Sequence, residues 1–128
     1  MNLFREIKWF IQRGKRGWAD CDAWGVSDYL NDILPQLLRR LKGQTGCPSE
    51  FYDAEATNNE CHRWDEALET MAQGFEAAKW LDKFGYHRWV DGPHGKKLEI
   101  DEQATANAQK KAEKGLQLFA KYYQGLWD

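Results

Sequence analysis

The stretch between residues 58 and 85 constrains the fold most strongly, because its large apolar residues recur at steps of three and four. That spacing brings side chains onto one face of an α-helix and predicts a core-facing stripe. The stripe consists of Trp64, Leu68, Met71, Phe75, Ala78 and Leu81. Asn58 or Asn59 is a suitable N-cap, and Gly85 is a suitable C-terminal stop. The sequence therefore predicts one long helix here, with an apolar face that packs in a core.

Three further stretches show the same helical spacing, at residues 2–13, 27–43 and 101–123. Ser27 and Asp101 are the expected N-caps of the last two. Pro35 predicts a kink, because it has no N–H for the carbonyl of Asn31. The chain of 128 residues suits a single domain. We expect an all-α fold over residues 1–128, a compact bundle of about four helices, with irregular segments at 13–26 and 85–100. The sequence leaves open whether a hairpin or a turn forms near Gly92.

The first half of the last predicted helix is rich in alanine, which favours close approach to a neighbouring helix. That neighbour belongs either to this chain or to another copy, so a homo-oligomer is one hypothesis. The residues expected on its inner side are Ala104, Ala108, Ala112, Leu116, Phe119 and Tyr123.

Charge and cysteine content narrow the class of protein. The formal net charge is −2, which gives no global bias toward nucleic acid, and DNA binding is not expected. No apolar stretch is long enough to span a membrane, and no membrane partner is expected. The three cysteines cannot all pair within one chain, and no signal-peptide pattern precedes them. These features predict free thiols and a cytoplasmic protein.

One segment, RGKRGWADCDAW at residues 13–24, combines cations, aspartates and tryptophans within a few residues. A second, smaller combination lies at residues 87–89. Such side chains can stack a base and neutralise a phosphate, and they also dominate protein-interface hot spots. A third interpretation places the tryptophans in the core. The candidate ligand-binding residues are Arg13, Lys15, Arg16, Trp18, Asp20, Asp22, Trp24, His87, Arg88 and Trp89.

Catalytic and metal-binding patterns are weak. Paired short Cys or His spacings typical of zinc sites do not occur, so no metal site and no cofactor are expected. Nucleophile and phosphate-loop motifs are also missing. A carboxylate cluster could hold a divalent cation, but helix capping explains it more simply. Its members are Asp20, Asp22, Asp28 and Asp32. The sequence therefore favours a non-catalytic protein and leaves a metal-dependent enzyme as the third alternative.

The order of motifs resembles a family of small proteins carried by tailed bacteriophages. The family pattern is a basic amphipathic helix, an R-G-aromatic-x-D-x-D-x-W motif, D-Y-L and a G-x-P turn. The matching positions are Arg16, Gly17, Trp18, Asp20, Asp22, Trp24, Asp28, Tyr29, Leu30, Gly46 and Pro48. The resemblance covers about residues 3–81. It implies expression in an infected bacterial cytoplasm and assigns no activity.

Two binding hypotheses follow. In the first, the protein sequesters a small anionic ligand, such as a nucleotide signal of antiviral defence. In the second, it inhibits a host or phage protein that it binds through its basic and aromatic surface. Both use the same cations and tryptophans, so the sequence leaves the choice open.

Overall fold

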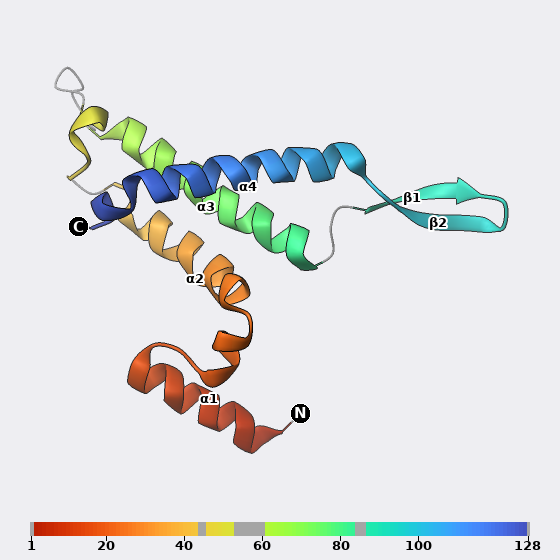
Figure 1. Ribbon diagram of the computed structural model, residues 1–128, viewed down its shortest axis with the longest axis horizontal. Coiled ribbons are helices and arrows are strands. Elements are labelled where there is room, and N and C mark those ends of the chain that lie inside the picture. The colour runs from red at the N-terminus through yellow and green to blue at the C-terminus, as the bar shows by residue number, and fades with distance from the viewer. Residues whose placement is uncertain (1, 44–45, 53–60, 84–86, 128) are drawn as a thin grey trace. The chain divides into compact units, whose positions relative to one another are not determined.

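A computed structural model of the chain describes residues 2–43, 46–52, 61–83 and 87–127 (Figure 1). The chain divides into two compact units, Met1–Leu30 and Asn31–Asp128, and the boundary falls within one helix. The α-helices are α1 (Leu3–Arg16), α2 (Val26–Leu41), α3 (His62–Lys83) and α4 (Glu102–Tyr122). The strands are β1 (His87–Gly92) and β2 (Gly95–Ile100), and short 3-10 helices lie at Asp20–Trp24, Ser49–Phe51 and Tyr123–Gly125.

The fold is mostly α, which confirms the helical part of the prediction. The strictly all-α prediction is wrong, because part of the segment 85–100 forms an antiparallel hairpin of β1 and β2. Gly92 pairs with Gly95 across a two-residue turn, and Gly95 has a φ of +113°, which favours glycine. The predicted irregular segment 13–26 is also more ordered than expected. Helix α1 continues to Arg16, and a 3-10 helix follows at Asp20–Trp24.

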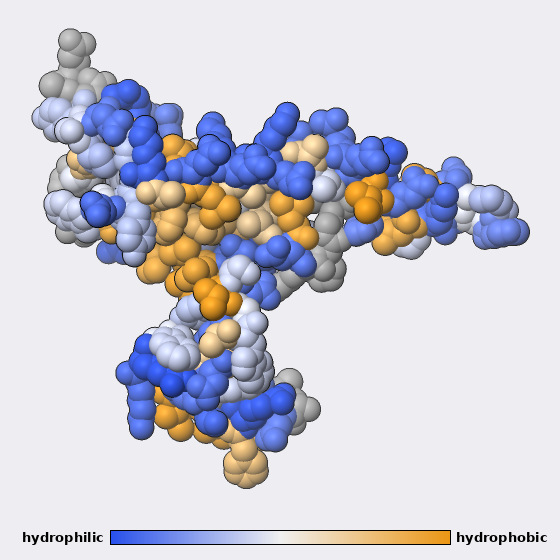
Figure 2. Space-filling model, viewed as in Figure 1, coloured by the Kyte–Doolittle hydropathy of each residue, from blue (hydrophilic) through white to orange (hydrophobic). Residues whose placement is uncertain are grey.

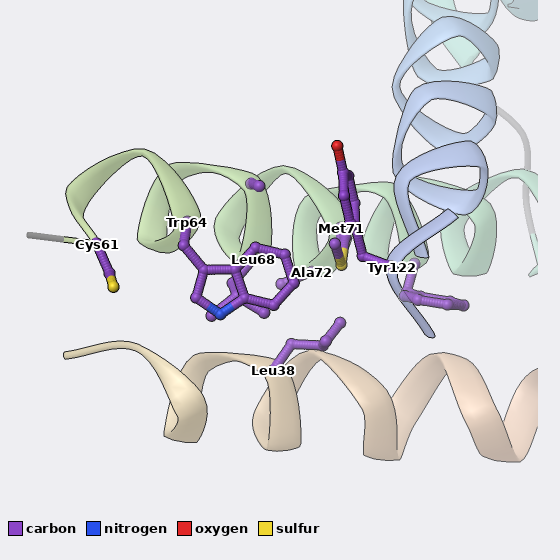
Figure 3. Close-up of a cluster of buried hydrophobic side chains, with 9 residues drawn as sticks. Leu38, Cys61, Trp64, Leu68, Met71, Ala72 and Tyr122 are labelled. Carbon is purple, nitrogen blue, oxygen red and sulfur yellow. The ribbon is translucent and has the colours of Figure 1, made fainter. Parts of the chain in front are cut away.

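The core of the second unit forms where the apolar stripe predicted it. Trp64, Leu68, Met71 and Phe75 of α3 are buried, which confirms these positions. Figure 3 shows Leu38 of α2 and Tyr122 of α4 directed toward this stripe. Three aromatic rings close one end of the core, with ring centroids 4.9–5.7 Å apart. They belong to Phe51, Trp64 and Tyr122.

Helices α3 and α4 approach closely in this chain, as the alanine content suggested. Ala108, Ala112 and Gly115 of α4 are buried. The rotation of α4 differs from the prediction, since Leu116 and Tyr123 are exposed rather than inward. Gly115 meets the backbone of α3, and this contact determines which face of α4 is inside.

Cys47 and Cys61 form a disulfide, so the prediction of free thiols is wrong for this pair. The two cysteines lie 14 residues apart in the sequence, and both pack at the core, which brings the sulfurs together. Cys21 is free and half-buried. Cytoplasmic location stays a prediction.

Of the predicted N-caps, the structure confirms one and contradicts another. Asp101 caps α4 by accepting a hydrogen bond from the N–H of Ala104 (3.0 Å), as expected. Ser27 lies inside α2, which begins at Val26, so it is not the N-cap. Asn58 and Asn59 lie outside the described residues. Within the described part of the chain, no helix has the length and apolar character needed to cross a membrane.

Candidate functional site: the junction of residues 13–24

The segment that was singled out in the sequence forms a polar junction in the first unit, between the end of α1 and the start of α2. Gly17 ends α1 with a φ of +83°, and its N–H donates to the carbonyl of Arg13 (2.9 Å). The chain then turns back along α1 through the 3-10 helix, within which Asp22 accepts from the N–H of Ala19 (2.8 Å). Ala19 is fully buried beneath this turn.

The cations of α1 hold the aspartates of the 3-10 helix. The Arg13 guanidinium donates two hydrogen bonds to the Asp22 carboxylate, at 3.0 and 2.7 Å. Arg16 donates one hydrogen bond to the Asp20 carboxylate and another to the carbonyl of Trp18 (3.0 Å). Hydrogen bonds from Arg13 and from the Ala19 N–H stabilise the charged form and lower the pKa of Asp22 to about 2. Two of the three predicted anion-binding cations are therefore already paired with carboxylates.

Gln12 strengthens the junction by bonding both to the side chain and to the backbone of one residue. Its amide nitrogen donates to Asp20 Oδ2 (2.8 Å), and its amide oxygen accepts from the Asp20 N–H (2.9 Å). The hydrogen bond from Gln12 to the carboxylate, together with the one from Arg16, lowers the pKa of Asp20. The Tyr29 hydroxyl, from the start of α2, donates to the carbonyl of Gly17 (2.5 Å).

The aromatic residues of the segment are only partly covered. The Arg16 guanidinium lies over the Trp18 ring, with its Cζ atom 3.8 Å from the ring centroid. Trp18 remains 43% exposed. Trp24 meets Trp9 of α1 edge-on, with centroids 5.9 Å apart, and is also exposed. The interpretation of both tryptophans as core residues is therefore wrong. Lys15 is exposed beside them.

His87, Arg88 and Trp89 lie on β1, in the second unit, and all three are exposed. Directly opposite residues share a face of a hairpin, so His87 and Trp89 lie with Ile100 and Leu98. Arg88 lies on the other face, opposite Glu99. The hairpin thus separates the cation from the indole that was expected to act with it.

The predicted carboxylate cluster is divided among different partners. Asp20 and Asp22 pair with arginines of α1, and Asp32 pairs with Lys79 of α3. Among the described residues, no group of three or more His, Cys, Asp or Glu side chains is arranged to hold a metal ion. The geometry of this segment indicates a structural role. We call the set of hydrogen bonds and ion pairs that joins α1 to the 3-10 helix the clasp.

The clasp leaves the apolar side of α1 exposed. Trp9, Gln12, Arg13 and Arg16 face the 3-10 helix, so the opposite side carries large apolar residues with no covering partner in the described structure. These exposed residues are Leu3, Phe4, Ile7, Phe10 and Ile11. No residue of α1 is buried. Figure 2 shows orange, apolar surface along the lower edge of this unit.

The sequence analysis identified this helix as amphipathic and did not assign its apolar face to a binding role. The sequence signal for this orientation of α1 is that polar Gln12, Arg13 and Arg16 recur at helical spacing on one side of the helix. That side meets the D-x-D segment. Comparison with protein-family models, curated proteins and solved structures finds no match to the chain.

Proposed function

We propose that the protein is a non-catalytic phage accessory protein that binds another protein, and that α1 is its docking helix. The observation that carries this proposal is the orientation of α1, whose polar side is held by the clasp while its apolar side is exposed. Phe4 is 85% exposed and Phe10 is 78% exposed. Exposed apolar patches of this kind commonly mark interaction sites.

The spacing of the exposed residues suits a helix that enters a groove. Leu3, Ile7 and Phe10 follow one another at steps of four and three, and Phe4 and Ile11 widen the same face. Helices that bind in grooves use anchors at these positions. Anchoring by large side chains in a desolvated pocket supplies most of the binding free energy in such complexes.

Charge indicates the chemistry of the partner. Helix α1 carries five cations and only one acid, Glu6. Three of the cations, Lys8, Arg13 and Arg16, are paired with aspartates of the clasp. Lys8 and Lys15 follow Phe4 and Ile11 by four residues and therefore border the apolar face. The fitting partner is a protein with an apolar groove and an acidic rim.

The clasp supplies the rigidity that such docking needs. Hydrogen bonds from Gln12, Arg13, Arg16 and Tyr29 fix both ends of the turn that follows α1. A pre-ordered helix loses less conformational entropy on binding than a disordered segment does. The unusual R-G-W-A-D-C-D motif thus has a structural role that serves binding indirectly.

The test is affinity capture from infected bacterial cells with matched variants. Phe10→Lys should abolish capture of the partner without lowering the melting temperature, because Phe10 contributes nothing to the core. Leu37→Lys on α2 also replaces an exposed apolar residue with lysine and should leave capture intact. Capture that survives Phe10→Lys would overturn the proposal, as would a marked loss of stability in that variant.

Sequestration of a small anion is the second candidate, supported by the exposed stack of Arg16 on Trp18 with Lys15 beside it. An incoming phosphate would compete with Asp20 for Arg16, which weakens this candidate. Native mass spectrometry separates the two functions. A discrete bound mass that disappears in Trp18→Ala would favour sequestration, whereas an unliganded mass favours protein docking.

A further inference from the structure

The hairpin of β1 and β2 carries an exposed apolar row on one face (Figure 1). Trp89 lies opposite Leu98, and Ile100 follows on the same face at the end of β2. Trp89 is 68% exposed, Leu98 is 53% exposed and Ile100 is 61% exposed. Among the described residues, neither buried apolar cluster of the second unit includes a hairpin residue. The described helices therefore leave this row largely uncovered.

The outer edge of β2 offers unpaired backbone groups. The sheet of the described structure has two strands, and Gly92 and Gly95 flank its two-residue turn. Residues that flank such a turn form a hydrogen-bonded pair, and the pairs alternate from there along the ladder. The N–H and C=O groups of Lys96, Leu98 and Ile100 therefore point away from β1. A two-stranded hairpin is only marginally stable alone, and such an edge is a template for a further strand.

The charges of β2 favour one symmetric register with a second copy of β2. A two-fold axis normal to the sheet places one residue of the strand opposite its own copy. Like charges directly opposite each other are destabilising, which disfavours an axis at Lys96, Lys97 or Glu99. An axis at either end of the strand leaves most of it unpaired. An axis at Leu98 pairs residues 96–100 of both copies.

In the register centred on Leu98 the two strands are complementary. Lys97 of each copy lies opposite Glu99 of the other, and opposite charges in this position are stabilising. Arg88 already lies opposite Glu99 within the hairpin, so the signs of the charges alternate across three neighbouring strands. On the other face, Trp89, Leu98 and their copies form one apolar row across four strands.

Lysine on an edge strand usually discourages pairing. Here the two lysines of β2 discourage the slipped registers, and the axis at Leu98 brings Lys97 opposite an acid of the paired strand. Glu99 already binds Lys97 of its own strand, at 2.9 Å. A carboxylate accepts several hydrogen bonds, so it can bind the lysine of the second copy as well.

The outer edge of β1 fits a second copy less well. An axis at Trp89 would place His87 opposite Asp91, and this pair attracts only when the histidine is protonated. Asp91 already pairs with Lys96 across the hairpin, at 2.7 Å. The β2 edge, with two lysine–glutamate pairs, is therefore the better match.

We propose that the hairpin is a dimerisation element, in which β2 pairs antiparallel with β2 of a second copy about a two-fold axis at Leu98. The two hairpins then form one four-stranded sheet. This surface belongs to the second unit, whereas the docking helix α1 belongs to the first. The dimer therefore goes beyond the docking role of α1 and does not depend on it.

The test is sedimentation velocity of the full chain over a range of concentrations, together with amide exchange measured by NMR. The wild-type protein should form a dimer that dissociates on dilution, because pairing at one edge buries little surface. The Leu98 N–H should exchange more slowly as the dimer forms, while exchange of the Trp89 N–H stays unchanged. A monomer at every concentration would overturn the proposal. Protection of the Trp89 N–H with rising concentration would overturn the choice of edge.

Lys97→Glu puts acids opposite each other at two positions and should abolish the dimer. Lys110→Glu, at an exposed position of α4, is the matched control for this change of charge and should leave the dimer intact. Leu98→Lys provides a second variant in case Lys97→Glu disrupts the hairpin itself, and it should also be monomeric. A dimer that persists in both variants, or that is lost in the control, would contradict the assigned register.

Phe10→Lys separates this surface from the apolar side of α1. If the hairpins join the two copies, this variant should dimerise as the wild-type protein does. Loss of the dimer in Phe10→Lys would assign self-association to α1 and overturn the role of the hairpin. Failure of the docking proposal, by contrast, would leave the dimer and its dependence on Lys97 unchanged.

Discussion

Replacing Gly74 with alanine tests the packing of α3 against α4. A Cβ atom built at Gly74 lies 2.7 Å from the Cα of Gly115 and 3.0 Å from the carbonyl oxygen of Lys111. Carbon atoms in contact normally sit about 3.5–4.0 Å apart. The clash is therefore close to 1 Å, and it is with backbone atoms, which cannot rotate away as a flexible side chain would.

The expected cost follows from two opposing effects. Overpacking a core costs about 1–3 kcal/mol, and a backbone clash belongs at the upper end of that range. Alanine recovers about 1 kcal/mol through its higher helix propensity. We expect Gly74→Ala to lower the free energy of unfolding by about 2 kcal/mol, or about 8 °C in melting temperature for a chain of this size.

Thermal and urea unfolding followed by circular dichroism measure this change. Gly14→Ala is the matched control, because it lies inside α1 and a Cβ there meets nothing within 4 Å. That variant should be neutral or slightly more stable. Gly115→Ala should resemble Gly74→Ala, and the double variant should cost less than the sum, because both substitutions force apart the same close approach of α3 and α4. A Gly74→Ala protein as stable as the wild type would refute the close approach of the two helices.

Two further predictions concern the disulfide and the clasp. Thiol titration of the oxidised protein should detect Cys21 alone, and reduction of the Cys47–Cys61 bond should cost about 3 kcal/mol by the loop-entropy account. Three reactive thiols before reduction would contradict the pairing. The folded-state pKa of Asp22 is about 2, below its ordinary 3.8, so its contribution to stability is present above pH 4 and lost as pH falls toward 2. Amide exchange of Ala19, measured by NMR, should accelerate over that range, and in Asp22→Ala, which removes the acceptor of this N–H, it should already be fast at neutral pH. Exchange that is independent of pH in this range, after correction for intrinsic rates, would contradict the role of this carboxylate.

The helical core could be predicted from sequence because its signal is local. Trp64, Leu68, Met71 and Phe75 recur at helical spacing on a single face, and their burial follows from that spacing. The face of α4 could not be predicted equally well. Leu116 is more apolar than Gly115, yet Gly115 is inside, because close backbone approach to Gly74 depends on the partner helix.

The candidate site, too, could be predicted only in part from the local sequence. The residue types at 13–24 indicated a special segment, and the structure brings Arg13, Arg16, Asp20 and Asp22 together. Their mutual pairing could not be read from the sequence, because the reversal after Gly17 returns the aspartates to the arginines of α1. The disulfide was missed for a related reason, since an odd number of cysteines does not reveal which two become neighbours.

Hydroxyl-radical footprinting of the protein, alone and bound to its captured partner, tests the docking role of α1 most directly. Phe4 and Phe10 should be modified readily in the free protein, at rates comparable to exposed Trp127 and far above buried Met71 after normalisation for intrinsic reactivity. Both phenylalanines should become protected in the complex while Trp127 stays reactive. Protection of Phe10 in the free protein, or equal modification in both states, would contradict the account.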